Sequence, residues 1–371
     1  MPADMSSDKI IYFAAGPAKV PGEVLQQAHE EFLNYNNTGI SVVELTHRGA
    51  DYGKINDEAE AALRELYQIP SNYKVLFLQG GGTGQFSAIP LNLCSSSDDV
   101  VDYVITGTWS SKAALEAEKY CKVNRVLPKT NVYTGIPNQS EWKLSNNAKY
   151  VYYCSNETIH GIEFDFIPET NGVPLVCDMS SNILTRPLDI TKFGVIFAGS
   201  HKNAGIPSVT IVIVREDLLG KGMPICPAVF DYKINAANKS LYNTPPTFSV
   251  YILGLVVKWI ISKGGVPAMD QHNALKSSLV YEVFDASNGF YYSVIKKENR
   301  SRMNIPFRIG GPSINGELET KFLNEAKARK MISLEGHPSV GGLRISLYNA
   351  ITLDETKAVV EFLKEFQANN Q

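Results

Sequence analysis

Val195-Ile196-Phe197-Ala198-Gly199-Ser200-His201-Lys202-Asn203 joins an apolar run of strand character to a lysine between small and amide-bearing residues. A single lysine in a loop is normally a solvated surface charge. A lysine at the carboxyl end of a buried strand can instead reach into a cleft, where desolvation lowers its pKa and favours imine chemistry. Lys202 is therefore the leading candidate for a reactive side chain.

The same strand belongs to an alternation of amphipathic helices and short apolar strands, which predicts an α/β sheet. A helix is expected over residues 57–68, because its apolar residues recur on one face. The predicted buried strands are residues 74–78, 100–105, 150–154, 173–177, 195–198 and 209–214. Open α/β sheets bind ligands outside the carboxyl ends of their strands. One site is therefore expected to collect the polar groups that follow these strands, which are Asn156-Glu157-Thr158, Asp178 and His201-Lys202.

A glycine-rich turn, Gly80-Gly81-Gly82-Thr83-Gly84, lies between the strand at residues 74–78 and a helix-like segment. Backbone N–H groups at such a turn and helix start can bind a phosphate. The turn lacks the Gly-Lys-Ser/Thr ending of a Walker loop and the GxGxxG spacing of a dinucleotide site. Taken alone, it is interpreted equally well as a phosphate site or as a tight structural turn.

Two further side chains each allow a structural and a chemical interpretation. Asp178, at the end of an apolar strand, would usually cap a helix, but it could also keep a pyridinium nitrogen protonated. Trp109, in Thr106-Gly107-Thr108-Trp109-Ser110, could be plain core or could stack on a pyridine ring. The series of glycine turn, Trp109, Thr158, Asp178 and Lys202 is far more specific than any member. It favours a site for pyridoxal 5'-phosphate (PLP).

Two cationic groups stand apart from this series, namely His47-Arg48 and the pair His337 and Arg344. Each alone is most simply a surface or ion-pairing feature. On a PLP site they would together supply anion receptors for a substrate with two or three negative groups.

Composition excludes several classes of function. A formal net charge of -3 over 371 residues gives no general attraction to nucleic acid or to an anionic membrane. The five cysteines have no metal-site or redox spacing and the six histidines form no HxxH pair, so reduced thiols and no metal site are expected. Residues 1–9 lack the apolar core of a secretion signal, and the apolar stretch 250–261 is too short to span a bilayer. A cytoplasmic protein is expected.

The chain is expected to divide into three parts, which are an N-terminal segment (1–15), a large domain (16–262) and a smaller α+β domain (263–371). Gly264-Gly265 and Pro267 mark the second boundary, after an apolar helix. The last helix is expected to start at Thr352, because Glu355 three residues later completes a capping box.

Over essentially its full length, the chain resembles the phosphoserine aminotransferases, a class-V family of fold-type I PLP enzymes. The blocks that carry the resemblance are Gly107-Thr108-Trp109-Ser110, Asn156-Glu157-Thr158-Ile159-His160-Gly161, Asp178-Met179-Ser180-Ser181, Tyr242-Asn243-Thr244-Pro245-Pro246 and Ser339-Val340-Gly341-Gly342-Leu343-Arg344. The resemblance implies a homodimer with shared active sites. It also implies transamination between glutamate and 3-phosphohydroxypyruvate in serine biosynthesis, giving phosphoserine and 2-oxoglutarate.

The resemblance assigns a role to each candidate residue. Lys202 would be the catalytic Schiff-base lysine, Asp178 would pair with the ring nitrogen, Trp109 would stack on the ring and Thr158 would contact its hydroxyl side. The cofactor phosphate would be held by Gly82, Thr83 and His201 of one chain and by Asn243 and Thr244 of its partner. The substrate's distal acid would meet His47 and Arg48, its α-carboxylate Arg344, and His337 would approach from the neighbouring chain.

Five positions depart from the family pattern: Gly49 for Ser, His201 for Gln, Ser208 for Gly, Pro338 for Arg and Ile345 for Ala. Pro338 removes an arginine that would grip the substrate phosphate. A lost charge-assisted hydrogen bond costs roughly 1.5–3 kcal/mol, about tenfold to a hundredfold in affinity. Proline also fixes φ and removes an N–H, so a moved loop is expected as well. Ser208 in turn suggests a shifted backbone.

Three functions stay open at this point. The first is phosphoserine aminotransferase activity with glutamate as the amino donor. The second is a diverged paralogue that transaminates a different, unphosphorylated 2-oxo acid, unless Arg302 or Lys297 replaces the charge missing at Pro338. The third is a PLP-binding protein with little catalysis, although such a protein has no need of the lysine and its partners. A cysteine desulfurase is set aside, because all five cysteines lie at or before Cys226.

Overall fold

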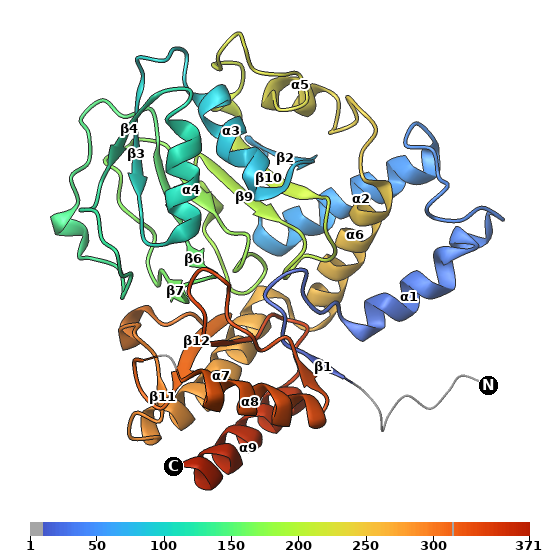
Figure 1. The fold of residues 1–371 in the computed structure, drawn as a ribbon. Helices are drawn as coiled ribbons and strands as arrows, with labels where there is room; N and C mark the ends of the chain where they lie inside the picture. Colours follow the sequence, from blue (N-terminus) through green and yellow to red (C-terminus); the bar gives the residue numbers. More distant parts are fainter. Residues whose placement is uncertain (1–9, 314) are drawn as a thin grey trace.

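The computed structural model describes residues 10–313 and 315–371, and a seven-stranded sheet forms its centre (Figure 1). The strands lie in the order β2 (Tyr73–Leu78), β10 (Thr210–Arg215), β9 (Val195–Gly199), β8 (Leu175–Asp178), β5 (Val151–Cys154), β3 (Val100–Val104) and β4 (Lys122–Arg125). Strand β10 is antiparallel to both neighbours, and the pairs from β9 to β4 are parallel. The predicted α/β fold with a mostly parallel sheet is confirmed.

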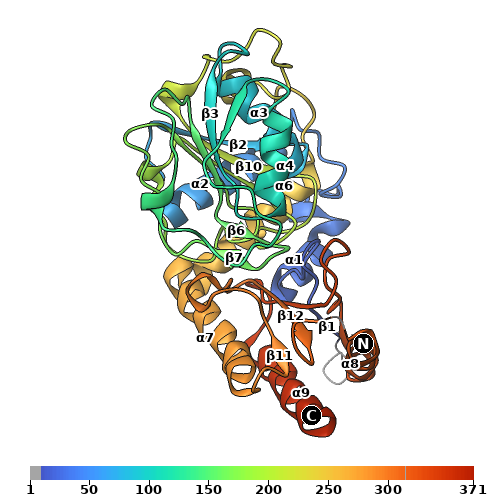
Figure 2. The ribbon, with the colours of Figure 1, turned by 60° about the vertical axis from the view of Figure 1, so that its left-hand side comes forward.

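Helices cover both faces of this sheet (Figures 1 and 2). One face packs against α2 (Ala50–Tyr67) and α6 (Thr247–Ser262), and the other against α3 (Gly81–Leu93) and α4 (Thr108–Ala117). Side chains alternate along β2, so Val75 and Phe77 enter the first core, whereas Leu76 and Leu78 enter the second. A sheet buried on both faces explains why its strands are almost continuously apolar.

A smaller sheet carries the C-terminal part of the chain. It pairs β11 (Tyr291–Tyr292), β12 (Asn304–Ile309) and β14 (Leu343–Ser346), and it packs with α7 (Gly265–Ala286), α8 (Gly316–Ala328) and α9 (Leu353–Asn370). Near the N-terminus, β1 (Ile11–Tyr12) pairs in parallel with β13 (Met331–Ile332), and Phe13 enters the C-terminal core. The chain's beginning is thereby tied to the C-terminal part. The boundary after residue 262 stays a prediction.

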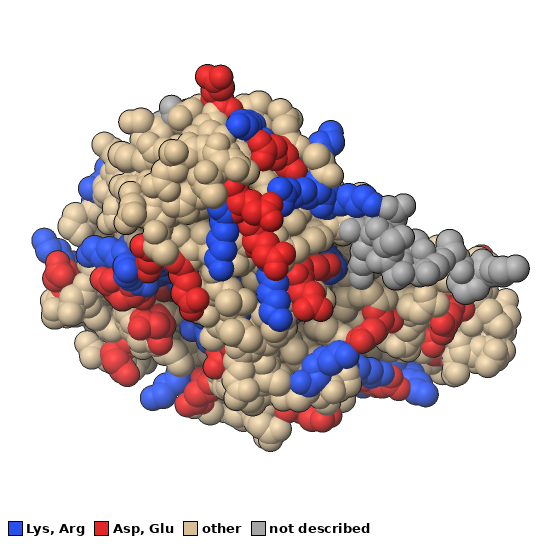
Figure 3. All heavy atoms as spheres, turned by 90° about the horizontal axis from the view of Figure 1, so that it is seen from below, with Lys and Arg blue, Asp and Glu red and all other residues tan. Residues whose placement is uncertain are grey.

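The remaining elements are short or peripheral. They are α1 (Gly22–Phe32), α5 (Tyr232–Ala237), the hairpin β6 (Asn156–Glu157) and β7 (Ile162–Glu163), and single 3₁₀ turns at 35–37, 139–141, 190–192, 216–218 and 297–299. Within the described residues, no single helix is long and apolar enough to cross a bilayer, and α6 with α7 meets that test only as a pair bent by 81°. Figure 3 shows basic and acidic side chains interspersed on one face.

The expected elements are largely found, with differences at their ends. The helix expected over 57–68 begins earlier, at Ala50, and the strand expected over 173–177 lies at 175–178, so that Asp178 ends the strand. Strand β4 was not predicted. The capping box at Thr352 and Glu355 is confirmed. All five cysteines are free thiols.

Candidate active site

A cavity of about 210 Å³ lies at the carboxyl ends of the central strands. It brings together seven of the predicted residues, which are Gly82, Thr83, Trp109, Thr158, Asp178, His201 and Lys202. Six residues without a predicted role complete its lining, namely Gly81, Phe86, Cys154, Asn156, Ser180 and Ser181. Segments distant in sequence therefore converge where an open α/β sheet normally binds a ligand.

Lys202 follows β9 in a short loop and is 8% exposed. Its Nζ donates a hydrogen bond to Thr158 Oγ1 at 2.7 Å. Burial lowers the pKa of Lys202, and the nearby Arg344 charge lowers it further, whereas Asp178 raises it. A buried amine with a lowered pKa is available as a neutral nucleophile and proton carrier.

Asp178 ends β8, the strand next to β9, and lines the same cavity. Its Oδ1 accepts a hydrogen bond from the Ser180 N–H at 2.9 Å. Burial raises the pKa of this carboxyl, and the hydrogen bonds from Ser180 act against that rise. A Cβ at Gly82 would lie 3.9 Å from Asp178 Oδ2, so the carboxylate and the glycine turn border one space. A buried carboxylate of this kind favours a cationic partner in that space.

The glycine turn starts helix α3. Gly80 and Gly81 have φ values of 92° and 64°, conformations that side chains other than glycine rarely adopt. The helix begins at Gly81, so Gly82 and Thr83 lie in its first turn, where backbone N–H groups have no partner within the helix. These N–H groups line the cavity at the positive end of the helix dipole, which makes this end of the cavity suited to a phosphate.

Trp109 stands at the start of α4, and a buried acid fixes it there. The Glu157 carboxylate accepts hydrogen bonds from the Trp109 N–H at 3.0 Å, the Ser110 N–H at 2.8 Å and Ser110 Oγ at 2.6 Å. A Cβ at Gly107 would lie 2.4 Å from Glu157 Cδ, so this approach requires glycine. Trp109 Nε1 is buried without a hydrogen-bond partner among the described residues. Its N–H is therefore free for a ligand in the cavity.

Glu157 is the main functional residue that sequence reasoning left without a role. Its position directly after a buried strand was noted, but its partners lie 47 and 48 residues earlier in the chain. Burial raises the pKa of Glu157, while the hydrogen bonds from Ser110 and Trp109 lower it. A strand-end acid followed by small polar residues was the only available signal.

His201 replaces the glutamine that the family pattern has at this position. Its ring lies against Gly16 and Gly199, whose hypothetical Cβ atoms would come within 3.0 and 2.8 Å of ring carbons. Burial lowers the pKa of His201 to about 4, with a smaller contribution from Lys202. The imidazole is therefore neutral near pH 7 and can donate one hydrogen bond to a ligand in the cavity.

Arg344 and His337 lie close together within one chain. Arg344, on β14, is half-buried, and its guanidinium has no hydrogen bond or ion pair among residues 10–313 and 315–371. Burial lowers its pKa, yet a guanidinium stays charged at neutral pH. Backbone hydrogen bonds of 2.8 Å, from the Arg344 N–H to the Leu334 carbonyl and from the Gly336 N–H to the Gly342 carbonyl, hold the two segments side by side. The pKa of His337 is lowered by burial and then by Arg344. The resemblance instead implied that His337 approaches from the neighbouring chain.

Besides Arg344 and His337, four predicted residues do not line the cavity of their own chain. Asn243 and Thr244 lie in the segment before α6, where the Thr244 carbonyl accepts a hydrogen bond from Gln79 Nε2 at 2.8 Å. His47 and Arg48 lie just before α2, and His47 Nε2 is buried without a partner in the described part of the chain. Their predicted roles all require a contribution to a second subunit or a rearrangement.

The loop around Pro338 is a closed turn. The Val340 N–H donates to the His337 carbonyl at 2.9 Å, so Pro338 occupies the second position of a four-residue turn, where proline is favoured. The His337 ring caps this turn, since the Ser339 N–H donates to His337 Nδ1 at 3.2 Å. Proline therefore fits this turn, and a displacement of the loop relative to the family stays a prediction. Ser208, at φ 99°, keeps a glycine-like backbone conformation.

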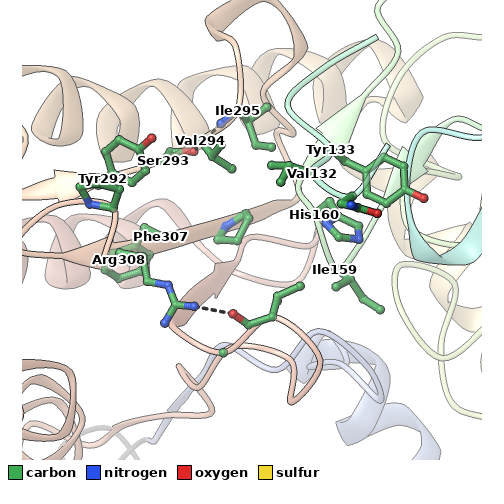
Figure 4. Close-up of a pocket in the computed structure, with 15 residues that line it drawn as sticks. Val132, Tyr133, Ile159, His160, Tyr292, Ser293, Val294, Ile295, Phe307 and Arg308 are labelled. Atoms are coloured by element: carbon green, nitrogen blue, oxygen red, sulfur yellow. Dashed lines mark hydrogen bonds between the residues drawn. The ribbon is translucent and has the colours of Figure 1, made fainter. Parts of the chain in front are cut away.

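A larger cavity of about 320 Å³ lies beside this site, between the β6–β7 turn and the small sheet (Figure 4). Tyr133 and His160 form one side, and Val294, Phe307 and Arg308 form the other. None of the predicted site residues belongs to its described lining. The smaller cavity, which collects the reactive lysine and its partners, is therefore the candidate active site.

Comparisons with known proteins agree with this site. The profile of class-V aminotransferases matches residues 10–359. A phosphoserine aminotransferase of Drosophila melanogaster is 54% identical over 363 residues, which are 98% of this chain and 100% of that protein. The solved phosphoserine aminotransferase from Bacillus circulans subsp. alkalophilus is 42% identical with a TM-score of 0.94, over 98% of this chain and 100% of that one. A PLP-bound phosphoserine aminotransferase from Trichomonas vaginalis is 43% identical with a TM-score of 0.91, over 96% of this chain and 100% of that one.

Proposed function

The chain belongs to the class-V aminotransferase family, and we propose that it transfers an amino group from glutamate to 3-phosphohydroxypyruvate. The products are 2-oxoglutarate and phosphoserine, as in the serine biosynthesis of its relatives. The observation that carries the proposal is the single cavity in which buried Lys202 and Asp178 border a glycine-rich helix start. The near-complete match to phosphoserine aminotransferases supports the choice of substrate.

The residues of the cavity fit PLP. This cofactor, when bound, supplies a reactive aldehyde and a ring that accepts electrons from the substrate. Lys202 would hold the aldehyde carbon covalently, Asp178 would pair with the ring nitrogen and Trp109 would stack on the ring. Thr158, which already accepts a hydrogen bond from Lys202, would meet the ring hydroxyl. The free Trp109 N–H and the buried Asp178 carboxylate are both groups that a ligand would satisfy.

The phosphate end of the cofactor would lie against the start of α3. Gly82 and Thr83 lie in the first turn of α3 and line the cavity, so their backbone N–H groups and the helix dipole would favour a phosphate there. His201, neutral in this setting, would add one donor in place of the family glutamine. Asn243 and Thr244 would come from a partner subunit.

Proton transfer would fall to Lys202. Its Nζ, which lies in the cavity, would take the proton from the substrate Cα and later give it up within the same cavity, while the bound cofactor would supply the ring that accepts the electron pair. The lowered pKa of Lys202 suits this task, because the amine must be neutral to accept the proton. Arg344, charged and unpaired in the described chain, would hold the substrate α-carboxylate and orient Cα toward the lysine.

We also propose a homodimer in which each subunit completes the other's site. Residues 47–48 and 243–244 do not line the cavity of their own chain, and each pair is preceded in sequence by exposed apolar side chains. These are Phe32, Leu33, Ile40 and Val43 before the first pair and Ile225, Val229 and Tyr242 before the second. Burying such a set against a second copy would explain its exposure. His47 and Arg48 would then reach the distal acid of the partner's substrate.

A spectral titration tests the proposed function. The purified protein with PLP is titrated with glutamate, then with phosphoserine, then with alanine, while visible absorbance is recorded. We expect glutamate and phosphoserine to change the spectrum and alanine to have little effect. A response to glutamate with none to phosphoserine would favour an unphosphorylated 2-oxo acid, for which Pro338 is the supporting observation. No chromophore after PLP is added would contradict both enzymatic functions.

A further inference from the structure

Pro338 stands where the family has an arginine, so the substrate phosphate lacks one cation. The structure shows which nearby basic side chains are already paired with acids and which are not. Arg302 is held by Asp270 at 2.6 Å, and Lys297 is held by Asp285 at 2.8 Å. Both side chains are therefore already paired with acids. Neither of these two candidates from the sequence is free to replace the missing charge.

Arg308 is near the Pro338 loop but is also engaged. Its guanidinium donates to the Val340 carbonyl, as Figure 4 shows, and lies 3.4 Å from Glu319. A Cβ at Gly341 would lie 3.3 Å from Arg308 Nη2, so the side chain packs on the loop backbone. Arg308 therefore anchors the loop that carries His337, and Glu319 offsets its charge.

Among the described residues, Lys112, unlike Arg302, Lys297 and Arg308, is not paired with an acid. It lies three residues after Trp109 on α4, a spacing that places both side chains on one face of the helix. Its Nζ stands 5.0 Å from the centre of the Trp109 ring. No carboxylate or carbonyl pairs with this ammonium anywhere in the described chain, so its charge is uncompensated apart from the ring.

The start of α4 and the loop that carries Pro338 border one cavity, because Thr108 Oγ1 lies 2.8 Å from His160 Nε2 and His160 lines that cavity with Val340 and Gly341. Burial, then Arg344, then Lys112 lower the pKa of His337, so the positive charges of Arg344 and Lys112 both act on its ring. Trp109 lines the cavity of Lys202. Lys112, His337 and Arg344 thus form a cationic group beside the proposed cofactor ring, with Pro338 next to His337.

We propose that Lys112 is a specificity-determining residue that binds the phosphate of the amino acceptor and replaces the charge missing at Pro338. This proposal rests on the proposed function, because it assigns a residue to the phosphorylated substrate of the same site. An ammonium has three donors on a flexible stem, so it can follow a dianion that moves during the reaction. A dianionic phosphate gains more from this added cation than the single distal carboxylate of glutamate does.

The test compares Lys112→Ala and Lys112→Arg with the unmodified enzyme, using glutamate and phosphoserine as amino donors. We expect Lys112→Ala to raise the KM for phosphoserine by roughly tenfold to a hundredfold, the cost of one charge-assisted bond. The KM for glutamate should change by about twofold or less, because a distal monoanion loses less. Lys112→Arg should restore most of the phosphoserine affinity. Lys119→Ala is the matched control, since Lys119 follows the same helix and pairs with Glu116.

A binding measurement that does not depend on turnover accompanies the kinetics. Inorganic phosphate is titrated calorimetrically into the PLP-loaded enzyme and into both Lys112 variants. Weaker phosphate binding in Lys112→Ala but not in Lys119→Ala supports the proposal, whereas equal binding overturns it. An equal rise of both KM values also overturns it, because that pattern indicates a structural role at Trp109. If the unmodified enzyme does not act on phosphoserine, the proposed function fails, and the phosphate titration still decides on Lys112.

Discussion

The cofactor end and the substrate end of the site are built differently. At the cofactor end, Lys202, Asp178 and Glu157 are buried at strand ends, and each has a hydrogen-bond partner in the same chain. At the substrate end, Arg344 is unpaired in the described chain, and His337 lies in an exposed turn. In the proposed function, the hydrogen-bonded groups would fix the type of reaction, whereas the unpaired charges would select the substrate. Substitutions at the substrate end, such as Pro338, can therefore be tolerated without loss of the chemistry.

The largest effect is expected at the cofactor end, from Lys202→Ala. The variant loses both the nucleophile and the proton carrier, so amino transfer should fall by about a thousandfold or more. Single-turnover absorbance changes with glutamate measure this loss. Lys192→Ala, ten residues earlier and exposed, is the control and should react normally. Loss of a general base slows a reaction by far more than roughly tenfold. If Lys202→Ala kept more than roughly a tenth of the rate, the assignment of this lysine would therefore be wrong.

A smaller effect is expected at the substrate end, from Arg344→Gln. Both amino acids present an α-carboxylate, so the KM for glutamate and that for phosphoserine should rise together, by about tenfold to a hundredfold. The dissociation constant of PLP should stay close to that of the unmodified protein, because Arg344 does not line the cofactor cavity. Equilibrium dialysis and steady-state kinetics separate the two quantities. A large loss of PLP would instead show that the two ends are not separable.

The pKa of Lys202 tests whether the cofactor end and the substrate end are independent, since charges from both ends act on this one amine. Burial and Arg344 lower this pKa, and Asp178 raises it. Covalent attachment of PLP needs the neutral amine, so its rate rises with pH and levels off above the pKa. Asp178→Asn removes an anion that favours the ammonium, so the profile should shift toward lower pH. Arg344→Gln should shift it the opposite way. The measurement is the rate of PLP attachment to the apoprotein of each variant across a pH series. Equal or reversed shifts would contradict the opposite effects of Asp178 and Arg344 on the pKa of Lys202.

The structure brings most residues predicted for the cofactor end into one cavity and none of those predicted for the substrate end, for a physical reason. Lys202 and Asp178 follow buried strands, and strand ends in an open sheet converge wherever the chain runs. Glu157 also follows a strand, but its role depends on backbone N–H groups of α4 that only the tertiary fold brings near. Nothing in the sequence indicates a binding role for Lys112, because an exposed lysine on a helix is ordinary. Its place over the Trp109 ring is visible only in the folded chain.

The same contrast applies to the elements of the fold. Buried strands were predicted within a residue or two, since their apolar runs are short and continuous. Helix α2 begins seven residues before the predicted Asp57. Gly53, a poor helix former, weakens the sequence signal for its first turns. Strand β4 is half-exposed at the edge of the sheet, and its sequence, Lys122 to Arg125, lacks an apolar run. Asn243 and Thr244 stay a prediction, because their assigned site belongs to a second copy.

The smallest expected effect concerns Ser208, a departure from the family in the loop that follows Lys202. Its φ of 99° is a conformation that costs a residue with a Cβ about 1–3 kcal/mol, and its side chain is exposed. Ser208→Gly should relieve that strain, although glycine also gains freedom in the unfolded chain, so a net gain of about 1 kcal/mol is expected. Ser208→Ala keeps the Cβ and should gain nothing. Urea unfolding midpoints of the three proteins measure the difference. An equal gain in stability in both variants would mean that the gain comes from removing the hydroxyl. Unchanged kinetics in Ser208→Gly would show that Thr158 and the strand end, rather than this strained residue, hold the loop that carries Lys202.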